Sequence, residues 1–232
     1  GKVLELPEDL KKELDNLGIH IVYGMEWLQK NGYSQKKNQE LVRRNPFLPY
    51  ALILSGLCMQ MVDSPRPVSG AEHMVSHMWD LNVLNENTKA LHGEQVGIAL
   101  MIITDYDKSL AHAIRHKRVT VKSETAKGLE MSLLEHTFGK KGLLEGILAE
   151  NTPNPLEDID LEQLEEQLPQ IEDLIDDLPD ADDMYAKLHD AGCMHEVSAL
   201  GIDKDTVELT LQSSPYVRNR LTLLRLAKLL EW

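Results

Sequence analysis

Two nearby segments carry the most specific signals for the fold. They are Ser64-Pro-Arg-Pro-Val-Ser-Gly-Ala-Glu-His-Met-Val-Ser-His77 and, after a short intervening segment, Leu91-His-Gly-Glu-Gln-Val-Gly97. Pro65 and Pro67 interrupt the chain, and Ser69 is expected to cap a helix that carries Glu72 in the place of a capping-box acid. A second, apolar helix is expected to begin at His92. The sequence therefore predicts two consecutive helices joined by a short segment.

Almost every other segment repeats its apolar residues with the helical period, so we predict an all-α fold. Residues 46–62 are nearly unbroken apolar, and their length and few β-branched residues predict a central helix buried on most sides. Residues 142–186 are rich in Asp and Glu, lack Lys and Arg, and predict short solvated helices broken at prolines. The last stretch, Pro215 to Trp232, predicts one amphipathic helix.

We expect residues 1–232 to form a single compact multi-helix domain. Its expected parts are N-terminal helices in 1–45, a metal-site core in 46–138, an acidic, proline-interrupted segment in 139–184 and C-terminal helices in 185–232. The sequence contains no Gly-x-Gly-x-x-Gly motif and no phosphate-binding loop, so a nucleotide site of the usual kind is not expected in this chain.

Three histidines are the candidate metal ligands. His73 and His77 stand four residues apart, so they share one face of a helix, and His92 approaches from the start of the next helix. Neutral imidazole is a common ligand of Zn²⁺, and catalytic zinc sites usually have three protein ligands. Two histidines at this spacing are also often a packed core pair, so the spacing alone leaves both interpretations open. His112 and His116 have the same spacing, but neighbouring Arg and Lys residues favour an exposed face.

The composition excludes several classes of partner. The formal net charge of -14 argues against nucleic acid and against an anionic membrane surface, because both require clustered Lys and Arg. No apolar run is long enough to cross a membrane, and the first residues do not resemble a signal peptide, which predicts a cytoplasmic protein. The two cysteines lack a Cys-x-x-Cys spacing and indicate no disulfide framework.

Four ordered motifs resemble the sn-glycerol-1-phosphate dehydrogenases. They are Ser55-Gly-Leu-Cys-Met59, Arg66-Pro-Val-Ser-Gly-Ala-Glu-His-Met-Val-Ser-His77, Leu91-His-Gly-Glu-Gln-Val-Gly97 and Arg218-Asn-Arg-Leu-Thr-Leu-Leu224. That family belongs to the superfamily of iron-containing alcohol dehydrogenases and dehydroquinate synthases. The resemblance covers the chain from about Pro46 onward and implies the C-terminal helical domain of the dehydroquinate synthase-like fold.

The resemblance implies roles for five residues. His73 and His92 would bind a divalent metal, zinc by preference with iron or nickel as alternatives, and His77 would lie near the reacting hydroxyl. Arg66 and Ser69 would contact a small phosphorylated polyol substrate. The implied function is the metal- and substrate-binding half of an NAD(P)-dependent oxidoreductase that transfers hydride between dihydroxyacetone phosphate and glycerol 1-phosphate.

Two parts of the family pattern are missing from the sequence. No nucleotide-binding domain precedes Pro46, so NAD(P) is expected only with a further N-terminal domain, and this chain alone is not expected to be active. No Gly-Asp pair, which supplies the family's aspartate ligand, lies upstream of His73; Asp15 and Glu26 are the only acids there in suitable helices. The alternatives are a non-catalytic helical association module, including a homo-oligomer, and a dehydroquinate synthase-like lyase domain.

Overall fold

The computed structural model describes residues 47–64, 68–85, 88 and 90–232. The chain divides into two units, residues 1–63 and residues 64–232, which are described here separately. The helices expected in residues 1–45 lie outside the described residues. Within the described part, helices dominate and the only sheet has two short strands, which confirms the all-α class.

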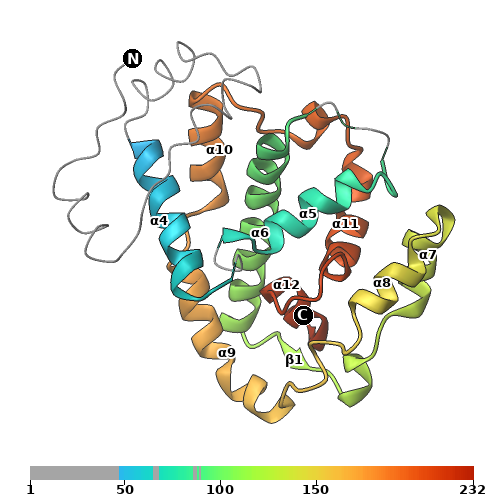
Figure 1. Cartoon of the computed structure of the whole chain (residues 1–232). Coiled ribbons are helices and arrows are strands. Elements are labelled where there is room, and N and C mark those ends of the chain that lie inside the picture. Colours follow the sequence, from blue (N-terminus) through green and yellow to red (C-terminus); the bar gives the residue numbers. More distant parts are fainter. Residues whose placement is uncertain (1–46, 65–67, 86–87, 89) are drawn as a thin grey trace. The chain divides into compact units, whose positions relative to one another are not determined.

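The described part of the first unit is a single helix, α4 (Phe47–Met61), as its apolar composition predicts (Figure 1). The side chains described in this helix, from Ile53 onward, are partly or fully exposed: Leu54 is 41% exposed and Met61 84%. The prediction of a helix buried on most sides is therefore wrong for these residues. A helix that is apolar all round needs partners on every side, and residues 47–63 hold only this one helix.

The second unit is organised around α5 (Ala71–Asp80) and the long helix α6 (His92–Arg115), which pack against each other (Figure 1). Helix α5 buries Met74, Val75, Met78 and Trp79, residues whose spacing of one, three and four places them on one helical face. Helix α6 is the longest of the described helices and continues well past Tyr106. The apolar period runs on through Leu110, Ala111 and Ile114, which are all buried.

The acidic segment contains longer helices than predicted. Helix α9 (Leu161–Asp176) packs on α6 and includes Pro169, which was expected to end a helix. Asp160 caps α9 by accepting hydrogen bonds from the amides of the second and third helical residues, and Leu168 and Ile175 bury its apolar face. Pro169 is exposed, so water can bind the carbonyl group that the missing amide leaves free. Helix α10 (Ala181–Asp190) also contacts α6.

The remaining elements are short and close the unit. Between α6 and α9 they are β1 (Thr120–Val121), η2 (Glu124–Lys127), α7 (Met131–Phe138), η3 (Gly139–Lys141) and α8 (Leu144–Glu150), where η denotes a 3-10 helix. After α10 they are η4 (Val197–Leu200), η5 (Lys204–Thr206), α11 (Val207–Ser213), η6 (Ser214–Tyr216), α12 (Leu223–Leu226), η7 (Ala227–Leu229) and β2 (Leu230–Glu231).

The C-terminal segment is not the single amphipathic helix that its leucines predict. It alternates 3-10 and α turns and ends in strand β2, which pairs antiparallel with β1 so that Thr120 faces Glu231 and Val121 faces Leu230. Three of its leucines are buried although no continuous helix carries them: Leu224, Leu229 and Leu230. Leu221 is 51% exposed. Long-range pairing with β1 therefore overrides the local period.

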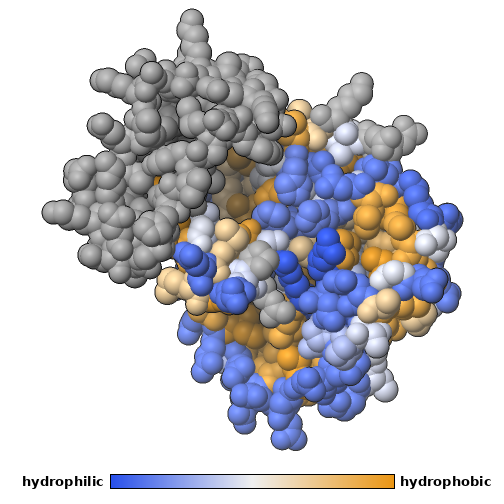
Figure 2. All heavy atoms as spheres, viewed as in Figure 1, coloured by the Kyte–Doolittle hydropathy of each residue, from blue (hydrophilic) through white to orange (hydrophobic). Residues whose placement is uncertain are grey.

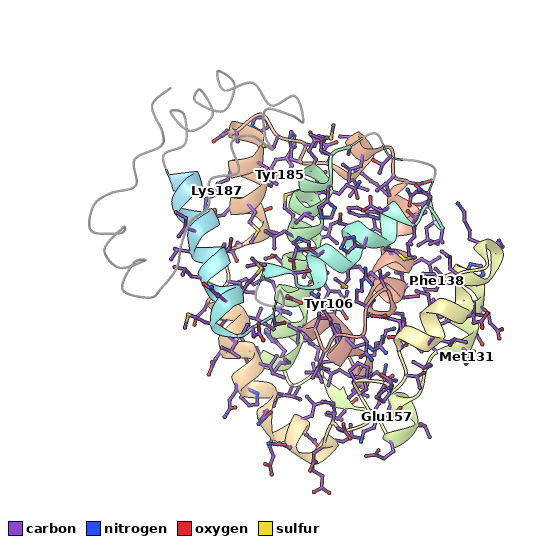
Figure 3. The ribbon with its side chains drawn as sticks, in the orientation of Figure 1. Tyr106, Met131, Phe138, Glu157, Tyr185 and Lys187 are labelled. Carbon is purple, nitrogen blue, oxygen red and sulfur yellow. The ribbon has the colours of Figure 1, made fainter. Side chains whose placement is uncertain are left out.

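Three clusters of buried apolar side chains hold the second unit together. One joins α5 to α6 through Val75, Trp79, Ile98 and Ala99, a second lies where α6 meets α9 and the C-terminal strand, and a third contains Phe138 of α7 (Figure 3). Hydrophobic residues also reach the surface between hydrophilic ones (Figure 2). Among the described residues no helix is long and apolar enough to span a membrane.

Candidate metal centre

The first turn of α5 fixes the orientation of the first histidine. The helix is capped by Gly70, not by Ser69 as the sequence predicted, and the Gly70 amide donates to Glu72 Oε1 at 2.8 Å. A Cβ atom on residue 70 would lie 2.6 Å from Glu72 Oε2, so only glycine leaves room for this folded-back carboxylate. The same Oε1 atom lies 2.7 Å from His73 Nδ1. A carboxylate can only accept, so His73 Nδ1 carries the proton and its Nε2 keeps a lone pair.

The structure brings the three predicted histidines together. Ring centroids are 6.4 Å apart for His73 and His77, 5.6 Å for His73 and His92, and 5.3 Å for His77 and His92. Imidazoles bound to one tetrahedral zinc ion at the usual Zn–N distance have centroids about 5 Å apart. The rings thus surround a space of the right size for one divalent ion.

A relay of hydrogen bonds sets the proton of His92. Gln95 Nε2 donates to Asp80 Oδ1 at 3.1 Å, which directs Gln95 Oε1 to accept from the Ser76 hydroxyl at 3.2 Å. Because the one hydroxyl proton of Ser76 is used there, His92 Nδ1 donates to Ser76 Oγ at 3.1 Å. His92 Nε2 is then left with a free lone pair, as in His73. Ser76 and Gln95 are buried, so the relay is shielded from water.

Asp80 is the residue that sequence reasoning missed. Its Oδ2 atom lies 3.7 Å from Nδ1 of both His77 and His92, and ligand atoms of these three residues come within 4.8 Å of one another. The signal was present as His77-x-x-Asp80, a spacing that places both side chains on one helical face. The family pattern places its aspartate ligand upstream of His73. The two acids considered there, Asp15 and Glu26, lie outside the described residues.

The cluster is open to solvent on one side. The side chains of His73, His77, His92 and Asp80 are 25%, 37%, 49% and 46% exposed. Burial, and then the electrostatic effect of the neighbouring His92 ring, lower the pKa of His77. A lowered pKa favours the neutral imidazole, which is the form that binds metals. The arrangement can therefore hold a cation and still leave a position for another ligand.

The other predicted residues fall elsewhere. Arg66 lies outside the described residues. The main chain of Ser69 is bound: its carbonyl oxygen accepts from Arg220 Nη1 at 2.6 Å. His112 and His116 are exposed, as predicted, with ring centroids 4.1 Å apart.

No family model and no solved structure matches the chain. Curated proteins do match it. A glycerol-1-phosphate dehydrogenase of Bacillus licheniformis is 44% identical over 64 residues, 27% of this chain and 16% of that protein. The enzyme of Natronomonas pharaonis is 50% identical over 56 residues, 24% of this chain and 15% of that protein. The enzyme of Pyrococcus horikoshii is 42% identical over 69 residues, 30% of this chain and 18% of that protein. Over these segments the chain is similar to the glycerol-1-phosphate dehydrogenases.

The matching segments span about one sixth of the length of these dehydrogenases. These relatives are named as glycerol-1-phosphate dehydrogenases that use NAD(P)+. This similarity agrees with the family resemblance of the four motifs.

Proposed function

We propose that this chain is the metal- and substrate-binding part of an NAD(P)-dependent glycerol-1-phosphate dehydrogenase-like oxidoreductase. The observation that carries the proposal is the convergence of three imidazoles from α5 and α6 on one space, with ring centroids 5.3 to 6.4 Å apart. The similarity to the glycerol-1-phosphate dehydrogenases supports the reaction class.

His73 and His92 are the proposed metal ligands, each through Nε2. Both Nδ1 atoms are occupied by hydrogen bonds, to Glu72 and to Ser76, which fix the ring orientation and direct the lone pair of Nε2 outward. Zinc is the proposed ion, and iron or nickel would suit the same donors. A cation shared by His77, Asp80 and His92 is the competing arrangement, because the ligand atoms of these three residues, a group without His73, lie within 4.8 Å of one another.

When bound, a divalent cation would supply a positive charge that stabilises negative charge on a substrate oxygen. His77, partly exposed beside the two ligands, is proposed to face the reacting hydroxyl group and to exchange a proton with it as a neutral imidazole. Arg66 and Ser69 remain the proposed contacts to the phosphorylated polyol. The nicotinamide would come from a nucleotide-binding domain that this sequence does not contain.

A metal titration tests the proposed ligands. Purified chain is titrated with Co²⁺ and Zn²⁺, and the variants His73→Ala, His77→Ala and His92→Ala are compared with His112→Ala, a matched exposed histidine. We expect the His73 and His92 variants to lose binding by at least about tenfold, with little change for the other two. If His77→Ala loses the metal while His73→Ala keeps it, the site moves to His77, Asp80 and His92.

The same titration addresses the alternative function. If neither ion binds the chain and the histidine variants leave its oligomeric state unchanged, the metal proposal fails and the non-catalytic association module becomes the better interpretation.

Activity is measured with dihydroxyacetone phosphate and NADH or NADPH after a nucleotide-binding domain from one of the related dehydrogenases is supplied. Turnover that is lost in His77→Ala with metal retained would support the role proposed for His77.

A further inference from the structure

A cavity of about 620 Å³ lies in the second unit, next to the start of α5, and Ser69 and Glu72 are among the residues that line it. It is bounded by the start of α5, the middle of α6 and the segments 178–184 and 220–223. Its walls are mainly apolar, with contributions from Leu100, Ile103, Leu178, Met184 and Leu223. The volume falls in the range of about 300 to 1,000 Å³ that small-molecule sites occupy.

Asp107 of α6, which follows Tyr106 (Figure 3), lines this cavity. The residue is only 7% exposed, and its Oδ1 atom has no hydrogen-bond partner in the described part of the chain. Burial raises the pKa of Asp107 to about 7. Buried polar atoms are nearly always paired because an unpaired one costs about 1 to 3 kcal/mol. Asp107 therefore brings to the cavity wall a carboxylate with one unpaired oxygen, which could accept a hydrogen bond from a bound ligand.

Four of the other polar side chains that line the cavity have partners. The Thr104 hydroxyl donates to Met184 Sδ at 3.8 Å, and Thr222 Oγ1 accepts from the Arg225 amide at 3.2 Å. Arg220 donates to the Ser69 carbonyl, and Glu72 accepts from Gly70 and His73. Asp107 is thus the acidic group that lacks a partner at Oδ1, and apart from these polar side chains the wall is mainly aliphatic.

We propose that this cavity binds a small amphiphilic amine, with its ammonium group on the Asp107 carboxylate and its aliphatic part against the leucine and isoleucine side chains. An ammonium group offers hydrogen-bond donors and an opposite charge together, which neither an alcohol nor a carboxylate ligand does. A paired cation removes the cost of the buried carboxylate. The aliphatic walls exclude strongly hydrated ammonium ions that have no apolar part.

Three leucines that line the cavity are also exposed to solvent, so a ligand can reach the cavity past them. Leu100 and Leu178 are each 41% exposed and Leu221 is 51% exposed, although all three line the cavity. Exposed leucines grouped around one opening are unusual for a soluble surface and mark binding sites more often than chance. An amphiphile that covers them would gain burial of apolar area in addition to the ion pair.

Calorimetry with n-hexylamine at pH 8 tests the proposal, with 1-hexanol and hexanoate as probes of matched length. We expect saturable binding of the amine, weaker binding of the alcohol and none of the acid. Asp107→Asn keeps the shape but removes the charge, so it should weaken amine binding by about tenfold or more. Asp105→Asn, on the exposed side of the same helix, should leave binding within about twofold.

Circular dichroism of both variants shows whether the helices persist. As a second measurement, amide signals of Thr104 and Leu221 in NMR spectra should shift with the amine and stay unchanged with hexanoate. Equal binding of n-hexylamine to the wild type and to a folded Asp107→Asn variant would overturn the proposal, as would tighter binding of hexanoate or a titration that never saturates. None of these results depends on metal binding at the histidine cluster, so the two proposals fail separately.

Discussion

Gln95 Nε2 donates to Asp80 Oδ1 at 3.1 Å and so links the last turn of α5 to the first turn of α6. The bond has a consequence beyond helix packing, because it orients the Gln95 amide and, through Ser76, leaves the proton of His92 on Nδ1. A buried amide thereby decides which nitrogen of the exposed His92 ring carries the proton.

Replacement of Gln95 by Leu should weaken metal binding although Gln95 is not a proposed ligand. Without Gln95 Oε1 the Ser76 hydroxyl is free to donate to His92 Nδ1, which moves the ring proton to Nε2 and blocks its lone pair. We expect a loss of roughly 10- to 100-fold in Co²⁺ or Zn²⁺ affinity, measured by titration. Gln167→Leu, at an exposed position of α9, is the control. Unchanged affinity in Gln95→Leu would show that the relay does not set the His92 tautomer.

Replacement of Gly70 by Ala should destabilise the start of α5. The added Cβ atom would lie 2.6 Å from Glu72 Oε2, so the carboxylate must leave and the Gly70 amide loses its partner. Loss of a helix cap costs about 1 kcal/mol, measurable by urea unfolding. Gly146→Ala is the matched control in α8, where nothing lies within 4 Å of the added atom, and it should stabilise by up to about 1 kcal/mol. Equal effects at both positions would contradict the assigned role of Gly70.

Replacement of Arg225 by Met should be strongly destabilising. Its guanidinium is fully buried, donates to the Pro215 carbonyl at 3.0 Å and to Asn154 Oδ1 at 2.9 Å, and lies 4.1 Å from the centre of the Tyr216 ring. Methionine fills similar space but donates to neither acceptor. Asn154 Oδ1 keeps its hydrogen bond from the Leu156 amide, but the Pro215 carbonyl loses the guanidinium, so we expect a loss of about 2 kcal/mol or more in unfolding free energy.

Arg115→Met tests whether that loss follows from burial. Arg115 is paired with Glu172 and Asp176 at the surface, and its removal should change stability little. A large loss at both arginines would indicate that charge removal alone, and not the buried acceptors, is responsible.

The stability of the protein should carry a pH dependence that comes from Asp107. Its pKa is raised from 3.8 to about 7 by burial, so the unfolded chain loses this proton first and the contribution to stability falls as the pH rises from about 4 to 7. Asp107→Asn should match the wild type near pH 4 and exceed it at pH 8 by up to about 4 kcal/mol, at about 1.4 kcal/mol per pKa unit. Thermal and urea unfolding across this range measure the difference, with Asp105→Asn as reference. A constant difference across the range would exclude the shifted pKa.

The spacing of His73 and His77 was enough to predict that they share a helical face, because residues four apart lie on one side of a helix. The approach of His92 depends on the packing of α6 against α5. The spacing was not enough to predict the carboxylate: Asp80 reaches His92 only because the segment between α5 and α6 turns the second helix back on the first. The capping prediction at Ser69 was wrong by one residue, because the folded-back Glu72 carboxylate takes the Gly70 amide. Pro169 was expected to end a helix, yet packing of α9 on α6 keeps the helix intact around it.

The apolar period and the residue spacing act locally along the chain, so they account for the all-α class, the two consecutive helices and the shared face of His73 and His77. The partners of those groups depend on tertiary packing. The Asp80 to His92 relay, the unpaired Asp107 in its apolar cavity and the pairing of strand β2 with β1 all join residues distant in sequence. Such contacts depend on how helices pack in space, and the local period carries no information about that packing.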